Sequence, residues 1–355
     1  MKDTALILTN GRLTTSDAKT AHGLIRGTER FTIVGVVDPL NCGKDAGDIV
    51  DGRFRNIPVF ESVRTFLDHS RQKPDYGIIG VALSGGRLPE EWNDILLEVL
   101  ENQISIISTM HQLLGEKPVL RDAARKNGVE IIDLRKPKPI DQLHFWSGEI
   151  YKVRAAKIAV LGMDCSIGKR TTARFITELC RQEGIRTEMI YTGQTGWLQG
   201  YKHGFIFDAT LNDFVSGELE QAVLECNRQS SPDLILIEGQ SGLRNPSGPC
   251  GSEIIVSADV KGVILQHAPF RKYYEDLEHL ACPLPDVKDE IELIRMYGAQ
   301  TLAVTLNGEG GTREELADYR NKLAQRLQLP VVCPLHEETA ALLPVIRKFI
   351  SQHRQ

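Results

Sequence analysis

The chain has 355 residues, of which 41% are hydrophobic and 25% charged, and its formal net charge is −5. This length favours about two domains, and the slightly acidic charge gives no general attraction to nucleic acid. No apolar run approaches the roughly 20 residues that span a bilayer, and the N-terminus lacks the apolar region of a secretion signal. Seven cysteines without a C-x-x-C pair indicate reduced thiols. We expect a cytoplasmic protein that binds neither nucleic acid nor membrane.

The N-terminal part alternates short apolar runs with amphipathic segments. Strands are expected at ALILT, FTIVGVV, YGIIGVAL, SIIST and EIIDL, and helices at 18–26, 62–70, 90–102 and 119–126. This alternation is typical of a parallel sheet with helices on both faces. We predict an α/β domain over residues 1–140.

Two Lys-Pro pairs mark a connection between domains, in the stretch LRKPKPIDQLHFWSGEIYK. Proline disfavours helix at the residue before it, so we predict a linker at 141–152. The second domain, 153–355, has expected strands KIAVLG, TEMIYTG, DLILIEG, GVILQ, QTLAVTLN and PVVC. Its expected helices begin near Lys169, Asn212, Val287, Arg313 and Glu337. The same rhythm predicts a second parallel α/β domain.

A glycine-rich turn follows the first strand of the second domain, in KIAVLGMDCSIGKRTTA. Such a turn directs backbone N–H groups at one point, and the helix N-terminus and a lysine add positive charge, which predicts a phosphate site. The predicted binding residues here are Gly162, Ser166, Gly168, Lys169, Arg170, Thr171 and Thr172. The spacing is unusual, because five residues separate the glycines and Arg170 stands where a hydroxyl residue normally follows the lysine.

A carboxylate ends another buried strand, in DLILIEGQSGL. Glu238 should lie at the carboxyl end of the sheet, near the phosphate site, where it could hold Mg²⁺ if that ion is used. The alternative is a solvated strand end. The loop and this strand together predict a site for a nucleotide or a similar phosphate-bearing ligand.

Both segments resemble dethiobiotin synthetase and its relatives, whose motifs read G-T-D-T-x-V-G-K-T and E-G-A-G-G. The resemblance implies a P-loop NTPase-like domain in which Asp164 is the loop aspartate, Glu238 the metal-binding glutamate and Asn307 the adenine-reading asparagine. Arg170 departs from the pattern, because it replaces the hydroxyl that would coordinate Mg²⁺. Its guanidinium either neutralises phosphate charge without a metal or points to solvent.

The whole chain resembles a narrower bacterial and archaeal family associated with D-glutamate N-acetyltransferase. The similarity rests on a Rossmann-like N-terminal domain and on GMDCSIGKRTTA, YTGQTG, FDATLNDFVSGELE, IEGQSGL and LQHAPFRKYYE. It implies acetyl transfer from acetyl-CoA to the amino group of D-glutamate or a related D-amino acid, with the phosphate loop anchoring CoA. Two alternatives remain open: a ligase or kinase that uses ATP and Mg²⁺, and a nucleotide-sensing regulatory protein.

Acetylating an amine requires a base. The candidates are Asp208, Asp213, Glu238 and His267, although Asp213 could simply stabilise a helix N-terminus and His267 could be hydrogen-bonded at a strand end. Arg271 and the residues 272–274 could bind a dicarboxylate or form an exposed helix start. The expected partner is a small acidic amino acid, and the exposed sheet edges allow a homo-oligomer.

Overall fold

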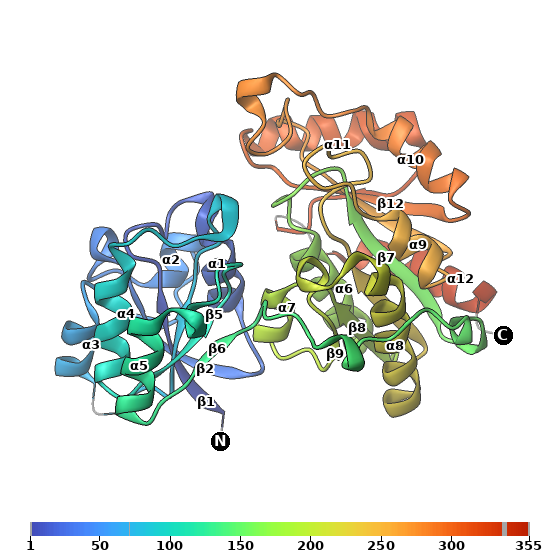
Figure 1. The fold of residues 1–355 in the computed structure, drawn as a ribbon. Helices are drawn as coiled ribbons and strands as arrows, with labels where there is room; N and C mark the ends of the chain where they lie inside the picture. Colours follow the sequence, from blue (N-terminus) through green and yellow to red (C-terminus); the bar gives the residue numbers. More distant parts are fainter. Residues whose placement is uncertain (1, 71, 336–338, 354–355) are drawn as a thin grey trace. The chain divides into compact units, whose positions relative to one another are not determined.

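The structure is a computed structural model that describes residues 2–70, 72–335 and 339–353. Its internal contacts divide the chain into two compact units, each built on a parallel sheet (Figure 1). Unit 1 comprises Met1–Lys138 and Gln194–Tyr201, and unit 2 comprises Pro139–Gly193 and Lys202–Gln355. The predicted fold class, two parallel α/β domains, is confirmed.

Unit 1 contains a six-stranded sheet of order β3-β2-β1-β4-β5-β6. Its strands are β1 (Asp3–Leu8), β2 (Phe31–Val37), β3 (Val59–Phe60), β4 (Tyr76–Ile79), β5 (Ser105–Ser108) and β6 (Ile131–Asp133). Its helices are α1 (Lys19–Arg26), α2 (Ala46–Asp51), α3 (Val63–His69), α4 (Trp92–Glu101), α5 (Pro118–Asn127) and α7 (Gln194–Leu198). Each face of the sheet has its own apolar core, one packed with α1, α2 and α7 and the other with α3, α4 and α5.

The sequence pattern located most of unit 1 and missed β3 and α2. Strand β3 has two residues and α2 has six, which is too short for a clear periodicity. Strand β4 ends at Ile79, although the expected strand continued to Leu83. Beyond it the Ala82 N–H donates to the carbonyl of Asp17, in the 3-10 turn Ser16–Ala18 that precedes α1.

Unit 2 contains a seven-stranded sheet of order β13-β12-β11-β7-β10-β8-β9. Its strands are β7 (Ala156–Gly162), β8 (Thr187–Tyr191), β9 (His203–Gly204), β10 (Leu234–Glu238), β11 (Gly262–His267), β12 (Gln300–Leu306) and β13 (Val331–Val332). Its helices are α6 (Lys169–Gln182), α8 (Asn212–Ser230), α9 (Ser252–Ser257), α10 (Val287–Met296), α11 (Arg313–Leu327) and α12 (Leu343–His353). The helix start expected near Glu337 lies outside the described residues.

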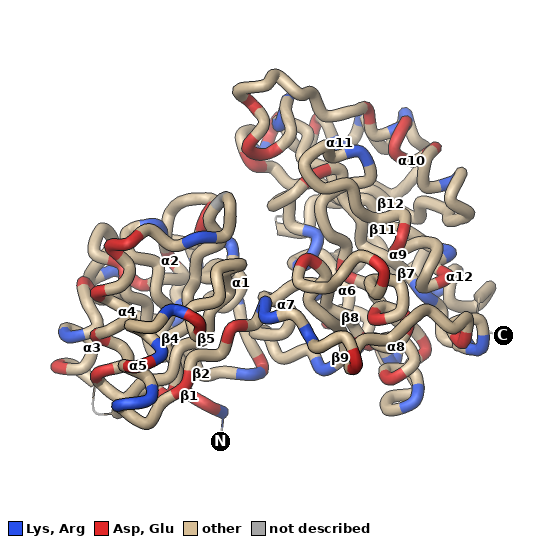
Figure 2. Tube along the Cα trace, viewed as in Figure 1, with Lys and Arg blue, Asp and Glu red and all other residues tan. Residues whose placement is uncertain are grey.

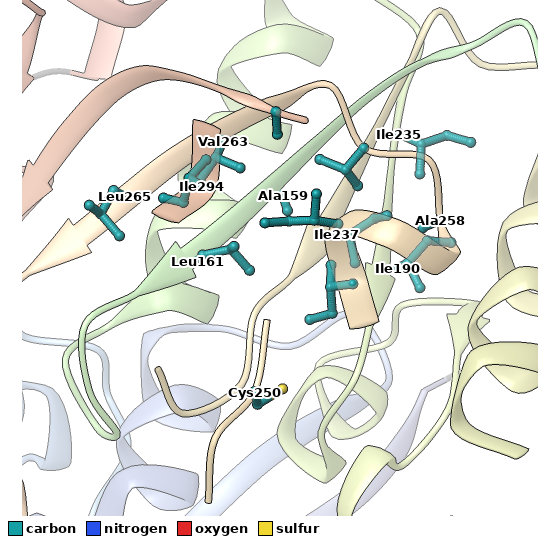
Figure 3. Close-up of a cluster of buried hydrophobic side chains, with 14 of the residues drawn as sticks. Ala159, Leu161, Ile190, Ile235, Ile237, Cys250, Ala258, Val263, Leu265 and Ile294 are labelled. Carbon is teal, nitrogen blue, oxygen red and sulfur yellow. The ribbon is translucent and has the colours of Figure 1, made fainter. Parts of the chain in front are cut away.

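The core of unit 2 explains why its central strands read as continuous apolar runs. Every residue of β7 is buried, because helices cover both faces of the sheet. Alternate side chains, such as Ala159 and Leu161 on β7 and Ile235 and Ile237 on β10, enter one large cluster with residues of α8 to α11 (Figure 3). The packed sheet gives the loops at its carboxyl edge a rigid base.

The predicted linker is held against helix α8. Glu218 accepts hydrogen bonds from the backbone N–H and the ring Nδ1 of His144, at 3.0 and 2.8 Å. Glu220 accepts from the N–H groups of Ser147 and Ile150, at 2.6 and 3.1 Å. Both carboxylates are buried, so the GELE part of the long motif noted above fixes this connection to unit 2.

Acidic and basic residues are interspersed along both units, as Figure 2 shows. Within the described ranges, no helix combines the length and the apolar character that crossing a membrane requires.

Candidate functional site

The phosphate loop connects β7 to the N-terminus of α6, and β7 lies between β10 and β11 in the sheet. Ser166 and Gly168 adopt the left-handed conformation, with φ of +54° and +101°. Where this conformation alternates with right-handed residues, successive N–H groups point to the same side and form an anion-binding concavity. Gly162 is required for another reason: a Cβ there would lie 2.7 Å from Cδ of Lys169. The lysine side chain therefore folds back across the loop.

Lys169 is a buried cation. Its Nζ donates to the carbonyl oxygens of Asp164 at 2.5 Å and of Ser241 at 2.8 Å, and the residue is 7% exposed. Burial lowers the pKa of Lys169, since removing the ammonium from water disfavours the charged form. Among the described residues, no carboxylate forms an ion pair with it. The carboxylates of Asp164 and Glu238 attract it without forming an ion pair, so a bound anion would be its direct partner.

Glu238 ends β10 beside the loop and is 4% exposed. One of its oxygens accepts from the Thr192 N–H at 3.0 Å, and the Gly193 N–H also interacts with it. Burial raises the pKa of Glu238, and the charges of Arg170 and Lys169 oppose that rise. The structure therefore brings Lys169, Arg170 and Glu238 into one electrostatic group.

Asp164 is fully buried and bonded to other parts of the protein. Its carboxylate accepts from the Cys165 N–H at 2.7 Å and from Asn245 Nδ2, Arg271 Nη1 and the Glu275 N–H, each at 2.8 Å. These bonds tie the loop to segments that come about 80 and 107 positions later in the chain. Asp164 stabilises the site, and its carboxylate is fully engaged by protein donors.

The other predicted loop residues have different surroundings. Thr171 is half-buried at the start of α6, whereas Thr172 is buried and donates to Gln266 Oε1 at 2.7 Å. Arg170 is half-buried. Asn307, expected to read adenine, donates from Nδ2 to the carbonyl of Ile167 at 3.2 Å. Its amide therefore supports the loop.

His267 follows Gln266 on β11, and the two side chains face opposite sides of the sheet because side chains alternate along a strand. Gln266 contacts α6, whereas His267 Nε2 lies 3.1 Å from the Tyr319 hydroxyl on α11. Burial lowers the pKa of His267 to about 4, so the imidazole is neutral at physiological pH. The structure places this candidate base away from α6.

The remaining candidate bases, Asp208 and Asp213, are exposed. Asp208 lies in a short 3-10 turn, Phe207–Ala209, and Asp213 lies in the first turn of α8. The described residues contain no group of three or more His, Cys, Asp or Glu side chains arranged to hold a metal ion.

Sequence reasoning missed the role of two residues. Asn245 was visible only as part of a Gly- and Pro-rich loop, and its buried amide contact with Asp164 leaves no local pattern. Arg271 was expected to bind substrate or to begin an exposed helix. The helix alternative is wrong, because the segment 268–277 is irregular and Arg271 contacts Asp164 and the Cys165 carbonyl.

Comparison with known proteins agrees with this architecture. Residues 144–343 match the family model described as "Domain of unknown function (DUF1611_C) P-loop domain", and residues 40–137 match its Rossmann-like N-terminal counterpart. Two curated proteins named D-glutamate N-acetyltransferase are similar to the chain. The one from Pseudoalteromonas sp is 26% identical over 270 residues, which cover 73% of this chain and 77% of the relative. The one from Tritonibacter scottomollicae is 28% identical over 274 residues, which cover 76% and 80%.

A solved structure is similar over the full length. The crystal structure of a DUF1611 family protein from Anabaena variabilis superposes with a TM-score of 0.88 at 25% identity, and the match covers 98% of this chain and all of the other. The resemblance to the family associated with D-glutamate N-acetyltransferase is thus confirmed. The chain belongs to the DUF1611 family, with a Rossmann-like N-terminal domain and a P-loop C-terminal domain.

Proposed function

We propose that this protein is an N-acetyltransferase that moves the acetyl group of acetyl-CoA to the amino group of D-glutamate or a related acidic D-amino acid. The names of two relatives that align over about three quarters of the chain support this reaction class. In the structure, the proposal rests on one observation: the buried ammonium of Lys169 lies against the phosphate loop and two carbonyl oxygens, with no carboxylate partner among the described residues.

Coenzyme A has the charges that such a site would bind, namely a pyrophosphate and a 3′-phosphate on adenosine. The loop N–H groups and Lys169 would hold one phosphate group, and Arg170 would add a second positive charge. An arginine after the lysine is compatible with this role, because anchoring a carrier breaks no phosphate bond and needs no metal-binding hydroxyl. Acetyl-CoA would supply the activated acetyl thioester.

Glu238 is the candidate base that the geometry favours. The amine must lose a proton before its nitrogen bonds to the acetyl carbon and the carbon–sulfur bond breaks. A carboxylate whose pKa is raised by burial is a better proton acceptor than an ordinary glutamate. Glu238 also lies beside Lys169 and Arg170, whereas Asp208 and Asp213 are exposed and His267 faces α11. We assign the proton acceptor to Glu238.

Two parallel incubations read by mass spectrometry test the proposal. One contains acetyl-CoA and EDTA, and the other contains ATP and Mg²⁺, each with the same panel of D- and L-amino acids. We expect an N-acetyl product and free CoA in the first, with acidic D-amino acids as substrates. Formation of ADP dependent on one amino acid would instead indicate a ligase or kinase. Ligand binding with no turnover in either incubation would indicate a regulatory protein.

A further inference from the structure

Three carbonyl groups of the phosphate loop are bound by side chains. The carbonyl of Asp164 accepts from Lys169 Nζ at 2.5 Å, that of Cys165 from Arg271 Nη1 at 2.9 Å, and that of Ile167 from Asn307 Nδ2 at 3.2 Å. A loop that binds phosphate must point its N–H groups at the anion, since a carbonyl oxygen in the same place would repel it. Holding the carbonyl groups fixes the peptide planes.

Arg271 is surrounded by negative charge. Its Nη1 lies 2.8 Å from Asp164 Oδ2 and 2.5 Å from Glu275 Oε2, and its Nη2 lies 3.5 Å from Glu309 Oε2. Three carboxylates thus share one guanidinium, whose side chain is 16% exposed. This environment is unsuited to a dicarboxylate substrate, because any further carboxylate would meet a net negative cluster.

Asn307 is engaged at both ends of its amide. Its Oδ1 accepts from the Glu309 N–H at 3.0 Å, while Nδ2 donates to Ile167. These two bonds hold the amide in one orientation, with Nδ2 directed at the loop backbone. Arg271 follows β11 and Asn307 follows the adjacent strand β12, so both reach the loop from the same edge of the sheet.

We propose that Arg271 and Asn307 are positioning residues of the phosphate loop: they hold the carbonyl groups of Cys165 and Ile167 so that the loop N–H groups face the bound anion. The inference rests on the part of the proposed function in which the loop binds phosphate, and it is independent of acetyl transfer. It assigns neither residue to contact with the amino acid or with adenine.

The test measures affinity by titration calorimetry for two probes, CoA and pyrophosphate, together with the KM for D-glutamate. The variants are Arg271→Ala, Arg271→Lys, Asn307→Ala and Asn307→Asp. Arg186→Ala is the matched control, since Arg186 forms an exposed ion pair with Asp233 in the same unit. Mutating residues that orient the ligands of a metal ion changes affinity about 10- to 100-fold, and we expect an effect of the same order here.

We expect Arg271→Ala and Asn307→Ala to lower the affinity for CoA and for pyrophosphate by about 10- to 100-fold. The KM for D-glutamate should stay within about twofold of that of the unmodified protein. Arg271→Lys should recover part of the affinity because an ammonium can still donate to the Cys165 carbonyl. Asn307→Asp should have a lower affinity for both probes than Asn307→Ala because a carboxylate repels the Ile167 carbonyl. Arg186→Ala should bind as the unmodified protein does.

An increased KM for D-glutamate in Arg271→Ala, with unchanged affinity for both probes, would overturn the inference and assign Arg271 to substrate binding. If Arg271→Ala does not fold, the same comparison is made with Asn307→Ala: unchanged affinity for both probes with an increased KM for D-glutamate would overturn the inference. Binding of pyrophosphate without binding of CoA would refute the proposed function, and the variants would still test the inference with pyrophosphate. If the unmodified protein binds neither probe, the inference is wrong.

Discussion

Replacing Gly242 with alanine should disturb the phosphate loop from outside. A Cβ at Gly242 would lie 2.6 Å from the Met163 carbonyl oxygen, 2.7 Å from its carbon and 3.0 Å from the Gly162 oxygen. All three are backbone atoms, so no side chain can rotate away and the loop itself must move. Overpacking of this kind costs about 1–3 kcal/mol of unfolding free energy. In a domain of this size, each kcal/mol corresponds to about 2–4 °C in Tm.

Differential scanning calorimetry measures that loss, and Gly248→Ala is the matched control. Gly248 belongs to the same loop, but the nearest atom to its Cβ would be Ser241 Oγ at 4.0 Å. We expect Gly248→Ala to remain within about 0.5 kcal/mol of the unmodified protein, and Gly242→Ala to lose stability and CoA affinity together. Equal Tm values for the two variants would refute the close approach of the Gly242 backbone to the loop.

Three further predictions concern titratable groups of unit 2. Lys169→Ala should weaken CoA binding about 10- to 150-fold, because it removes a charge-assisted hydrogen bond that contributes about 1.5–3 kcal/mol. Unchanged affinity in calorimetric titration would exclude the loop as the CoA site. Glu238→Gln should keep CoA affinity but lose the acidic limb of the kcat/KM profile, which rises as the carboxylate with its raised pKa deprotonates; an unaltered profile would show that Glu238 is not the base. Burial lowers the pKa of His267 from 6.5 to about 4. As the pH falls from about 6.5 to about 4, the unfolded chain binds a proton that the folded protein does not, so the folded protein should lose about 3 kcal/mol of stability over this range. Acid denaturation of His267→Gln should therefore be flatter between those pH values than that of the unmodified protein, and equal slopes would contradict this.

The strands and long helices of both domains could be predicted from the sequence because their patterns are local. The run from Ala156 to Gly162 is apolar at nearly every position, as a strand covered on both faces must be. The switch to helix at Lys169 follows from the glycine turn. Strand β3 and helix α2, of two and six residues, were not predicted because neither shows a clear period.

The assignment of the segment Gln194–Tyr201 to unit 1 could not be predicted, for a different reason. This segment lies within the sequence of the P-loop domain, yet its contacts place it in unit 1. Leu198 is fully buried in the unit 1 core, and Gln199 Nε2 donates to the carbonyl oxygens of Gly23 and Gly27. No local pattern states which core a short helix will join, because that depends on packing with residues far away in the chain.

The sequence by itself determined the two α/β domains, the loop at Gly162–Lys169 and the carboxylate at the end of β10, because turn chemistry and strand periodicity are properties of neighbouring residues. Only the tertiary structure decided the roles of the polar residues around that loop. It directs Arg271 and Asn307 to the loop backbone, buries Asp164 against Arg271 and Asn245, and turns His267 toward α11. The side to which a side chain points, and the donor or acceptor that it meets there, depend on contacts between segments about 50 to 140 positions apart.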